Sequence, residues 1–238
     1  MNERPVWPPP HVKVHGSVAT MDLDPDLQLL TAWQSGDKRA ADSILVKYYT
    51  LVRRTVLTKV PEGAVDDIVQ DVFEALVERR DSFRAGAKLK TFVLTIVRNK
   101  IADYFRKRKT TVQVDVLATS VRDLGAGPSS LLLKHEDDRL LLEALRSIQL
   151  DDQLVLELHY WDDMSGPELC QVFECSEPAI RGRIRRAKER LNIELQTLSR
   201  DHRELADTVT DLHTWAKKLR DGLGPYLEQL KRGKRARD

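Results

Sequence analysis

Apolar residues recur at three- and four-residue intervals along most of the chain, which is the spacing of one face of an α-helix. Breaks at Gly36–Asp37, Pro61–Gly63 and the polar loop 81–88 divide residues 23–109 into four such segments. Each segment carries an apolar stripe that must be buried against its neighbours. This part of the chain therefore predicts a small all-α domain of four helices.

The third of these helices, predicted at 64–80, has an acidic face opposite its apolar stripe. The apolar positions are Ile68, Val69, Val72, Phe73, Leu76 and Val77, and the polar positions are Asp66, Asp67, Gln70, Asp71 and Glu74. Acidic residues near the start of a helix also interact favourably with its dipole, so an ordinary solvated face explains some of them. DNA would repel a face this acidic, and a protein is therefore the more reasonable partner.

The fourth helix, predicted at 89–107, finishes in the basic run Arg106–Lys109. Cations at a helix C-terminus are favourable by themselves, so the run does not require a ligand. Helical periodicity is then lost over residues 110–134, where Gly125–Ser130 has the composition of a flexible linker.

A second helical block occupies residues 135–198. After two apolar stripes, a short helical segment at Pro167–Phe173 is followed by a tight turn at 174–176 and by a longer helix. The apolar face of that longer helix consists of Ile180, Ile184, Ala187 and Leu191. Helix, short turn and second helix is the sequence form of a helix-turn-helix DNA reader. We predict two small helical domains, 23–109 and 135–198, joined by the linker 110–134.

The second helix of this motif is strongly basic. Its cations are Arg181, Arg183, Arg185, Arg186, Lys188 and Arg190. At about 100° per residue, with Ile180 at the centre of the buried face, Gly182, Arg185 and Arg186 point furthest from the core. Such a face fits the phosphate charge of DNA, and arginine is the usual reader of guanine.

Arg185 and Arg186, with Arg181 beside them, are therefore predicted to enter the major groove. Arg183 and Lys188 are predicted to contact phosphate or to pair within the domain. Gly182 allows a close approach to the groove, at some cost in helix stability.

The two ends of the chain lie outside these domains. Residues 1–22 are proline-rich and without pattern, so we expect a disordered N-terminal extension. Residues 199–238 continue a heptad-like apolar stripe as far as Leu219 and then meet Gly222–Pro225. We predict a helical C-terminal extension that docks on the protein itself, on a regulatory protein or on a second copy.

Composition is that of a globular protein, with 41% hydrophobic and 32% charged residues and a net charge of only +2. The charges are segregated: acidic residues dominate 62–81 and 136–163, and basic residues dominate 98–109 and 181–190. Segregation of this kind favours two kinds of partner, one of them a polyanion. No apolar run reaches the length of a membrane span, and the proline-rich start does not resemble a signal peptide, so we predict a cytoplasmic location and no membrane contact.

The chemistry of a catalyst is not visible in the sequence. Cys170 and Cys175 lack a second pair of ligands for zinc, and plain burial is the preferred interpretation of both. The histidines are scattered, without a nucleophile pattern beside them, and no glycine-rich phosphate loop occurs. We expect no enzyme activity, no metal and no cofactor.

With both blocks in view, the chain resembles a bacterial RNA polymerase sigma factor of the sigma-70 family, extracytoplasmic-function (ECF) class, with a C-terminal extension. Val65–Phe73 resembles the family's acidic helix that docks on polymerase. Phe83–Arg84 with Lys90–Asp103 resembles the loop and helix that melt the −10 element, and Cys175–Leu191 resembles the −35 reader. The resemblance implies that 23–109 is sigma region 2 and 135–198 is sigma region 4.

The resemblance also implies partners and roles. The partners would be core RNA polymerase (through its β′ clamp helices and β flap), promoter DNA, and an anti-sigma factor or other regulatory protein. For the melted −10 strand, the implied residues are Phe83, Arg84, Lys88, Lys90, Phe92, Arg98 and Asn99. For the upstream backbone they are Arg106, Lys107 and Arg108, and for the −35 duplex they are Arg181, Gly182, Arg183, Arg185, Arg186 and Lys188. For polymerase they are Asp66, Asp67, Gln70, Asp71, Phe73 and Glu74.

Two other functions stay open at this point. One is a helix-turn-helix regulator that binds duplex DNA without joining polymerase, although such a protein has no need of the acidic helix and basic loop. The other is a helical scaffold that uses the C-terminal heptads, which salt-sensitive, sequence-selective DNA binding would exclude.

Overall fold

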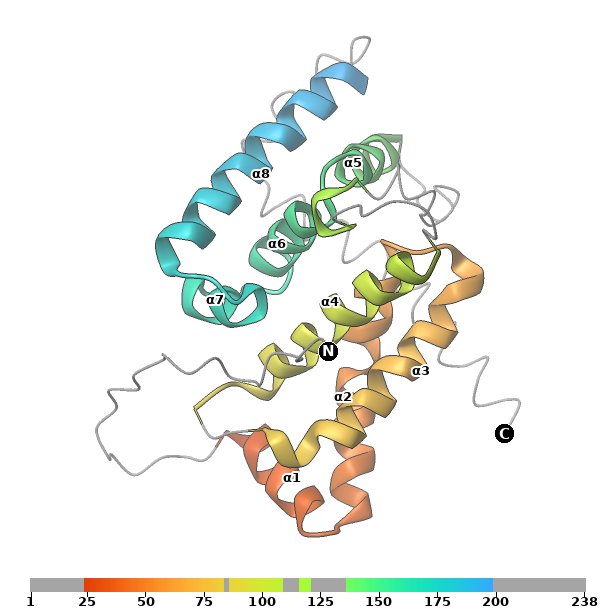
Figure 1. Cartoon of the computed structure of the whole chain (residues 1–238), viewed down its shortest axis with the longest axis vertical. Coiled ribbons are helices and arrows are strands. Elements are labelled where there is room, and N and C mark those ends of the chain that lie inside the picture. The colour runs from red at the N-terminus through yellow and green to blue at the C-terminus, as the bar shows by residue number, and fades with distance from the viewer. Residues whose placement is uncertain (1–23, 84–85, 109–115, 121–135, 199–238) are drawn as a thin grey trace.

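The computed structural model of the chain is all-α and describes residues 24–83, 86–108, 116–120 and 136–198 (Figure 1). The two termini and most of the predicted linker lie outside these residues, so the predictions for 1–22 and 199–238 stay predictions. The part that is described contains α-helices and two short 3-10 turns, and no named strand. Within it, no helix combines the length and the apolar character that crossing a bilayer requires.

The first two helices form a hairpin with polar caps. α1 (Pro25–Gln34) begins after Asp24, whose carboxylate accepts the N–H of Asp26 at 3.0 Å. α2 (Lys38–Leu57) begins after Asp37, whose carboxylate accepts the N–H of Arg39 at 2.8 Å. Each aspartate satisfies backbone donors that a helix start leaves unpaired, which explains why the chain turns at these points.

α3 (Glu62–Arg79), the 3-10 turn η1 (Arg80–Ser82) and α4 (Leu89–Arg108) complete the N-terminal domain. Every residue of α4 from Thr91 to Val97 is buried. A helix that is apolar all round must be covered on all sides. α2 and α3 cover one side of α4, and α7 of the next domain covers another.

The C-terminal domain consists of α5 (Glu136–Ser147), α6 (Leu150–Tyr160), α7 (Gly166–Phe173) and α8 (Glu177–Leu198). α7 and α8 form the predicted helix-turn-helix. α7 starts with a capping box, in which the Glu168 carboxylate accepts the Ser165 N–H at 2.7 Å. It ends at Glu174, which is left-handed (φ 52°), and the turn then leads into α8.

The predicted linker implied no contact between the two domains, but in the structure they pack directly on each other. Figure 1 shows α4 between the N-terminal helices and the α6–α7 region. The buried side chains of both domains form one continuous apolar cluster. Within the predicted linker, η2 (Val116–Ala118) packs on α4 and α6 instead of being free, and the Leu150 N–H donates to the Thr119 carbonyl at 2.9 Å.

Candidate nucleic-acid interface

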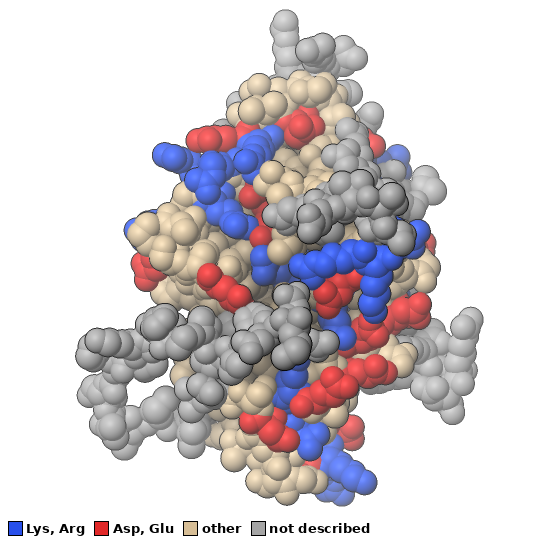
Figure 2. Space-filling model, in the orientation of Figure 1, with Lys and Arg blue, Asp and Glu red and all other residues tan. Residues whose placement is uncertain are grey.

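α8 presents a basic face to solvent. Ile180 and Ala187 are fully buried, which fixes the rotation of the helix on its domain. Arg181, Arg185 and Arg186 are exposed as a result. Figure 2 shows Lys and Arg side chains gathered over this helix, at the upper left. The rotation agrees with the one worked out from the sequence.

Two of the outward arginines, Arg181 and Arg185, pair with glutamates of their own helix. Arg181 Nη1 lies 3.2 Å from Glu177 Oε2, and Arg185 Nε lies 3.8 Å from Glu189 Oε1. The two arginine side chains are 67% and 75% exposed. Exposed pairs of this type contribute little to stability, so DNA can replace the glutamates at small cost.

Gly182 gives Arg186 room to fold back. A Cβ built at Gly182 would lie 3.2 Å from Arg186 Nη1, and the nearest atoms all belong to that guanidinium group. The space over the glycine is therefore occupied by the far end of a flexible side chain. When Arg186 moves away, the bare backbone of α8 is exposed at this point.

Arg183 and Lys188 are turned toward their own domain. Arg183 Nη1 donates to Asp151 Oδ2 at 2.6 Å, and its guanidinium carbon lies 5.4 Å from the centre of the Phe173 ring. Lys188 Nζ lies 5.8 Å from the centre of the Tyr160 ring. The sequence left two roles open for Arg183 and Lys188, phosphate contact or pairing within the domain. In this structure both residues make intradomain contacts.

Asp151 on α6 is shared by one arginine from each domain. Arg98 of α4 binds it in bidentate fashion, with Nε 2.7 Å from Oδ1 and Nη2 2.8 Å from Oδ2. Arg98 also lies over Phe173, at 5.3 Å, so this ring contacts the guanidinium groups of both Arg98 and Arg183. Burial acts to lower the pKa of Arg98, but the hydrogen bonds to Asp151 together with the attraction of that carboxylate and other nearby negative groups outweigh it and raise that pKa above its ordinary value.

Two further cations of the predicted strand-binding set face the C-terminal domain. Lys88 Nζ lies 2.8 Å from Glu168 Oε1, and Lys90 Nζ donates to the Asp162 carbonyl at 2.7 Å. Burial acts to raise the pKa of Glu168, but Lys88 and Ser165 bind its charged form and lower the pKa to about 2. In this arrangement Arg98, Lys88 and Lys90 therefore serve as interdomain contacts.

The aromatic residues of the same set are packed inward. Phe92, which the sequence analysis assigned to the melted strand, is only 3% exposed, so it cannot reach a strand in this arrangement. The reason is the burial of α4 on all sides, which leaves no open face at this position. Phe83 is half-buried and meets Phe92 edge-on, with ring centres 5.4 Å apart. Asn99 is half-buried, and Arg84 lies outside the described residues.

The basic end of α4 is open to solvent. Arg106, Lys107 and Arg108 are all exposed. Arg106 Nη1 lies 2.8 Å from Asp103 Oδ1, and Arg108 Nη1 donates to the Tyr104 hydroxyl at 2.7 Å. Both contacts lie within the helix itself, so this cluster is free to meet a phosphate backbone.

The acidic face of α3 is also accessible. Its exposed members are Asp66, Asp67, Gln70 and Glu74, and Asp71 is half-buried. Gln70 Nε2 donates to Glu74 Oε1 at 2.8 Å, and Asp66 pairs with Arg53 of α2. Phe73 is half-buried and stacks on Tyr49 with ring centres 6.4 Å apart. The carboxylates of α3 are therefore accessible, while the opposite, apolar side of the helix is buried in the domain core.

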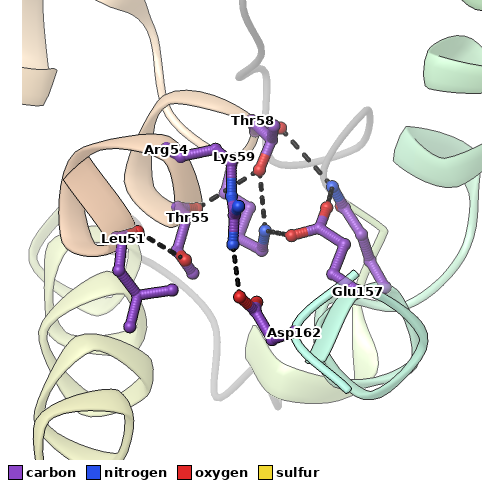
Figure 3. Close-up of polar contacts among 8 residues, drawn as sticks. Leu51, Arg54, Thr55, Thr58, Lys59, Glu157 and Asp162 are labelled. Carbon is purple, nitrogen blue, oxygen red and sulfur yellow. Dashed lines mark hydrogen bonds and ion pairs between the residues drawn. The ribbon is translucent and has the colours of Figure 1, made fainter. Parts of the chain in front are cut away.

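A buried ion pair joins the two domains at the end of α2 (Figure 3). Lys59 is fully buried and pairs with Glu157 of α6, which is 4% exposed. Thr58 Oγ1 lies 2.7 Å from Lys59 Nζ, and Gln153 Nε2 donates to Glu157 Oε1 at 2.9 Å. Burial lowers the pKa of Lys59, and Glu157 opposes that shift. Close by, Arg54 Nη2 donates to Asp162 Oδ1 at 2.6 Å.

Comparison with known proteins gives one consistent result. The family model for Sigma-70 region 2 matches residues 44–111, and that for Sigma-70 region 4 matches residues 138–191. The chain is 27% identical over 184 residues to the ECF RNA polymerase sigma-E factor of Escherichia coli (strain K12), covering 74% of this chain and 96% of that one. It is 22% identical over 182 residues to the ECF RNA polymerase sigma-E factor of Haemophilus influenzae, covering 73% and 96%.

The chain belongs to the sigma-70 family, in its ECF class. It is a sigma factor: it binds core RNA polymerase and promoter DNA, directs promoter-specific transcription, and is not an enzyme. The sequence analysis identified this function, and its two alternatives are set aside. In fold, the sigma factor is similar to CnrH, solved in complex with the cytosolic domain of CnrY (TM-score 0.52, 23% identity, covering 73% of this chain and 99% of that one).

Sequence reasoning missed the residues that hold the sigma factor's two domains together. Glu157 does carry a signal, because it is a single charge inside the apolar run Leu154–Leu158. A charge at such a position needs a buried partner. Nothing in the sequence, however, shows that the partner is Lys59, which lies 98 residues away.

Proposed function

We propose a division of labour among the surfaces of this sigma factor. α8 reads the −35 duplex through Arg181, Arg185 and Arg186, α4 and the loop before it receive the melted −10 strand, and the acidic face of α3 docks on the β′ clamp helices. The observation that carries the proposal is the rotation of α8, which buries Ile180 and Ala187 and turns the three arginines outward. Its site of action is then the cytoplasm, where we also expect any anti-sigma factor to meet it.

The reader assignment is tested by the double variant Arg185→Ala/Arg186→Ala. A good arginine–base contact contributes about 1–3 kcal/mol, so we expect promoter affinity of the holoenzyme to fall by roughly tenfold or more. The measurement is run-off transcription with core polymerase, first on a promoter library and then on the selected promoter. Arg39→Ala, which removes an exposed cation at the start of α2, is the matched control. Equal losses in both variants would contradict the assignment.

The packed arrangement of the domains is, we propose, the resting form of the free protein. Arg98, Lys88 and Lys90 are occupied by carboxylate or carbonyl groups of the C-terminal domain. A melted strand needs those cations for its phosphates. The domains must therefore separate when promoter DNA and polymerase are engaged.

Glu157→Gln tests whether the buried pair holds this resting form closed. Removing one partner of a buried pair typically costs about 3–5 kcal/mol, because the other charge is left uncompensated. We expect the domains to separate, so that Lys59 reaches water, and small-angle X-ray scattering should show a larger radius of gyration. Glu143→Gln, at an exposed position of α5, makes the same chemical change away from the interface. Indistinguishable scattering from wild type and Glu157→Gln would contradict the closed resting form.

A further inference from the structure

The only two cysteines of the chain both lie in the helix-turn-helix, one on each side of the residue that ends α7. Cys170 is in the last turn of α7, and Cys175 follows the left-handed residue Glu174. The N–H of Cys175 donates to the carbonyl of Cys170 at 3.1 Å. This bond across six residues is that of a Schellman-type helix end.

A helix end of this kind brings two specific side chains together. The residues joined by the six-residue hydrogen bond usually make a side-chain contact, which is apolar in most proteins. Here both positions are cysteine, so the two thiols are the side chains that this helix end brings together. Both thiols are free and only partly buried, so a small oxidant can reach them.

The surroundings distinguish the two sulfurs. Burial raises the pKa of the Cys175 thiol, while the positive charges of Arg183 and Arg98 act in the opposite direction and stabilise its thiolate. Burial also raises the pKa of Cys170, with only Arg181 acting against it. The pKa of both thiols is thus raised overall, but two arginines act against burial at Cys175 and only one does so at Cys170. We therefore take Cys175 as the sulfur that attacks first, and Cys170, which the helix end places beside it, as the sulfur that resolves the product.

We propose that Cys170 and Cys175 form a reversible modification site, in which a hydroperoxide oxidises the pair to an intramolecular disulfide. The Cys175 thiolate attacks one oxygen of hydrogen peroxide, the O–O bond breaks, and a sulfenic acid and hydroxide are formed; the hydroxide takes up the proton that Cys175 released on ionising and becomes the first water. Cys170 then attacks the sulfenic sulfur, the S–S bond forms, and a second water leaves with the Cys170 proton. The two sulfurs together lose two electrons, and the peroxide gains them. A low-molecular-weight thiol reverses the reaction by exchange.

The disulfide acts on the end of the helix-turn-helix that positions α8. An S–S bond of about 2.05 Å is much shorter than a hydrogen-bonded contact between thiols. Its formation pulls Cys175 toward α7, and with it the turn that carries the first residues of α8. Arg181 and Arg183 lie in the first two turns of α8, directly after this turn. We infer that the oxidised protein reads duplex DNA less well, an effect that rests on the proposed role of α8.

The bond itself is tested without DNA or polymerase. The full-length protein is treated with hydrogen peroxide, alkylated and digested with trypsin, which releases both cysteines in the single peptide Ser147–Arg181. We expect this peptide to lose the mass of two hydrogen atoms, to resist alkylation, and to recover both thiols after dithiothreitol. In Cys170→Ser, dimedone should trap a sulfenic acid on Cys175. Two thiols that remain open to alkylation after peroxide, or cross-linked dimers in place of the internal bond, would overturn the proposal.

Its effect on reading is tested by run-off transcription from a selected promoter, with sigma factor oxidised before core polymerase is added. We expect promoter affinity to fall roughly tenfold, the loss of about one arginine–base contact, and to return with dithiothreitol. Cys170→Ser/Cys175→Ser, with its helicity checked by circular dichroism, should be unaffected by peroxide. A loss that persists in this variant would place the effect elsewhere, for example at methionine, and would refute the inferred effect on reading. Failure of the reduced protein to start transcription would instead refute the function proposed for the domains.

Discussion

At the scale of single residues, Glu168 has two functions that depend on one negative charge. It closes the capping box at the start of α7, and it pairs across the interface with Lys88 at 2.8 Å. Both interactions favour the ionised form, and they outweigh burial, so its pKa falls from 4.5 to about 2. A group with a lowered pKa stabilises the fold above its unfolded pKa and loses that contribution as the pH falls.

The stabilisation by Glu168 should therefore depend on pH between 4.5 and about 2. We expect Glu168→Gln to be less stable than wild type at neutral pH, and the difference to shrink as the pH falls from 4.5 toward about 2. The measurement is urea unfolding at a series of pH values. Glu189→Gln, at an exposed residue of α8, should show almost no such difference. A difference that stays constant with pH would show that the charge of Glu168 is not what stabilises the fold.

At the scale of elements, the helices were predictable because apolar spacing, prolines and glycines are local signals. The predicted α3 and α4, the turn at 174–176 and the rotation of α8 all agree with the structure. The sequence predicted one apolar stripe on α4, whereas the structure buries every residue of Thr91–Val97. Burial on the remaining sides depends on a second domain, which no local pattern can reveal. The assignment of residues to the melted strand therefore stays a prediction, and their contacts with the C-terminal domain could not be predicted from local sequence.

α8 offers a test of what its glycine contributes. Replacing glycine by alanine inside a helix usually stabilises it by about 0.5–1 kcal/mol. The added Cβ at Gly182 meets only the mobile end of Arg186, so we expect Gly182→Ala to raise the thermal midpoint. We also expect weaker promoter binding, because the backbone of α8 can no longer approach the groove as closely. Calorimetry and run-off transcription measure the two effects, and a variant that gains stability without losing affinity would show that close approach is not needed.

At the scale of the whole molecule, the two proposed nucleic-acid surfaces are connected through one carboxylate. Asp151 holds Arg98 of α4 and Arg183 of α8 at the same time, while its neighbour Asp152, among the residues that the structure describes, pairs with Arg190 of its own domain. Two adjacent aspartates on α6 thus differ in that one of them spans the interface. This difference allows interdomain and intradomain effects to be separated.

Asp151→Asn should release Arg98 and weaken the closed arrangement. We expect the free protein to bind a single-stranded −10 oligonucleotide several-fold more tightly without polymerase, since Arg98 gains access to phosphate. Fluorescence anisotropy at several salt concentrations measures this affinity and its electrostatic part. Asp152→Asn is the matched control and should leave strand binding unchanged. If both variants bind as wild type does, the interdomain pair does not limit access to the strand.

The burial of Thr91–Val97 in the first half of α4 has a thermal consequence. Parting the domains wets the apolar side chains of α4 that α7 covers, and wetting apolar surface carries a positive heat capacity. The apolar contribution to closure therefore weakens on cooling. Cooling should therefore shift the free protein from the closed arrangement toward the one with separated domains. Because the separated arrangement is the one that engages polymerase and promoter DNA in our proposal, the temperature of the cell would affect how readily this factor is engaged.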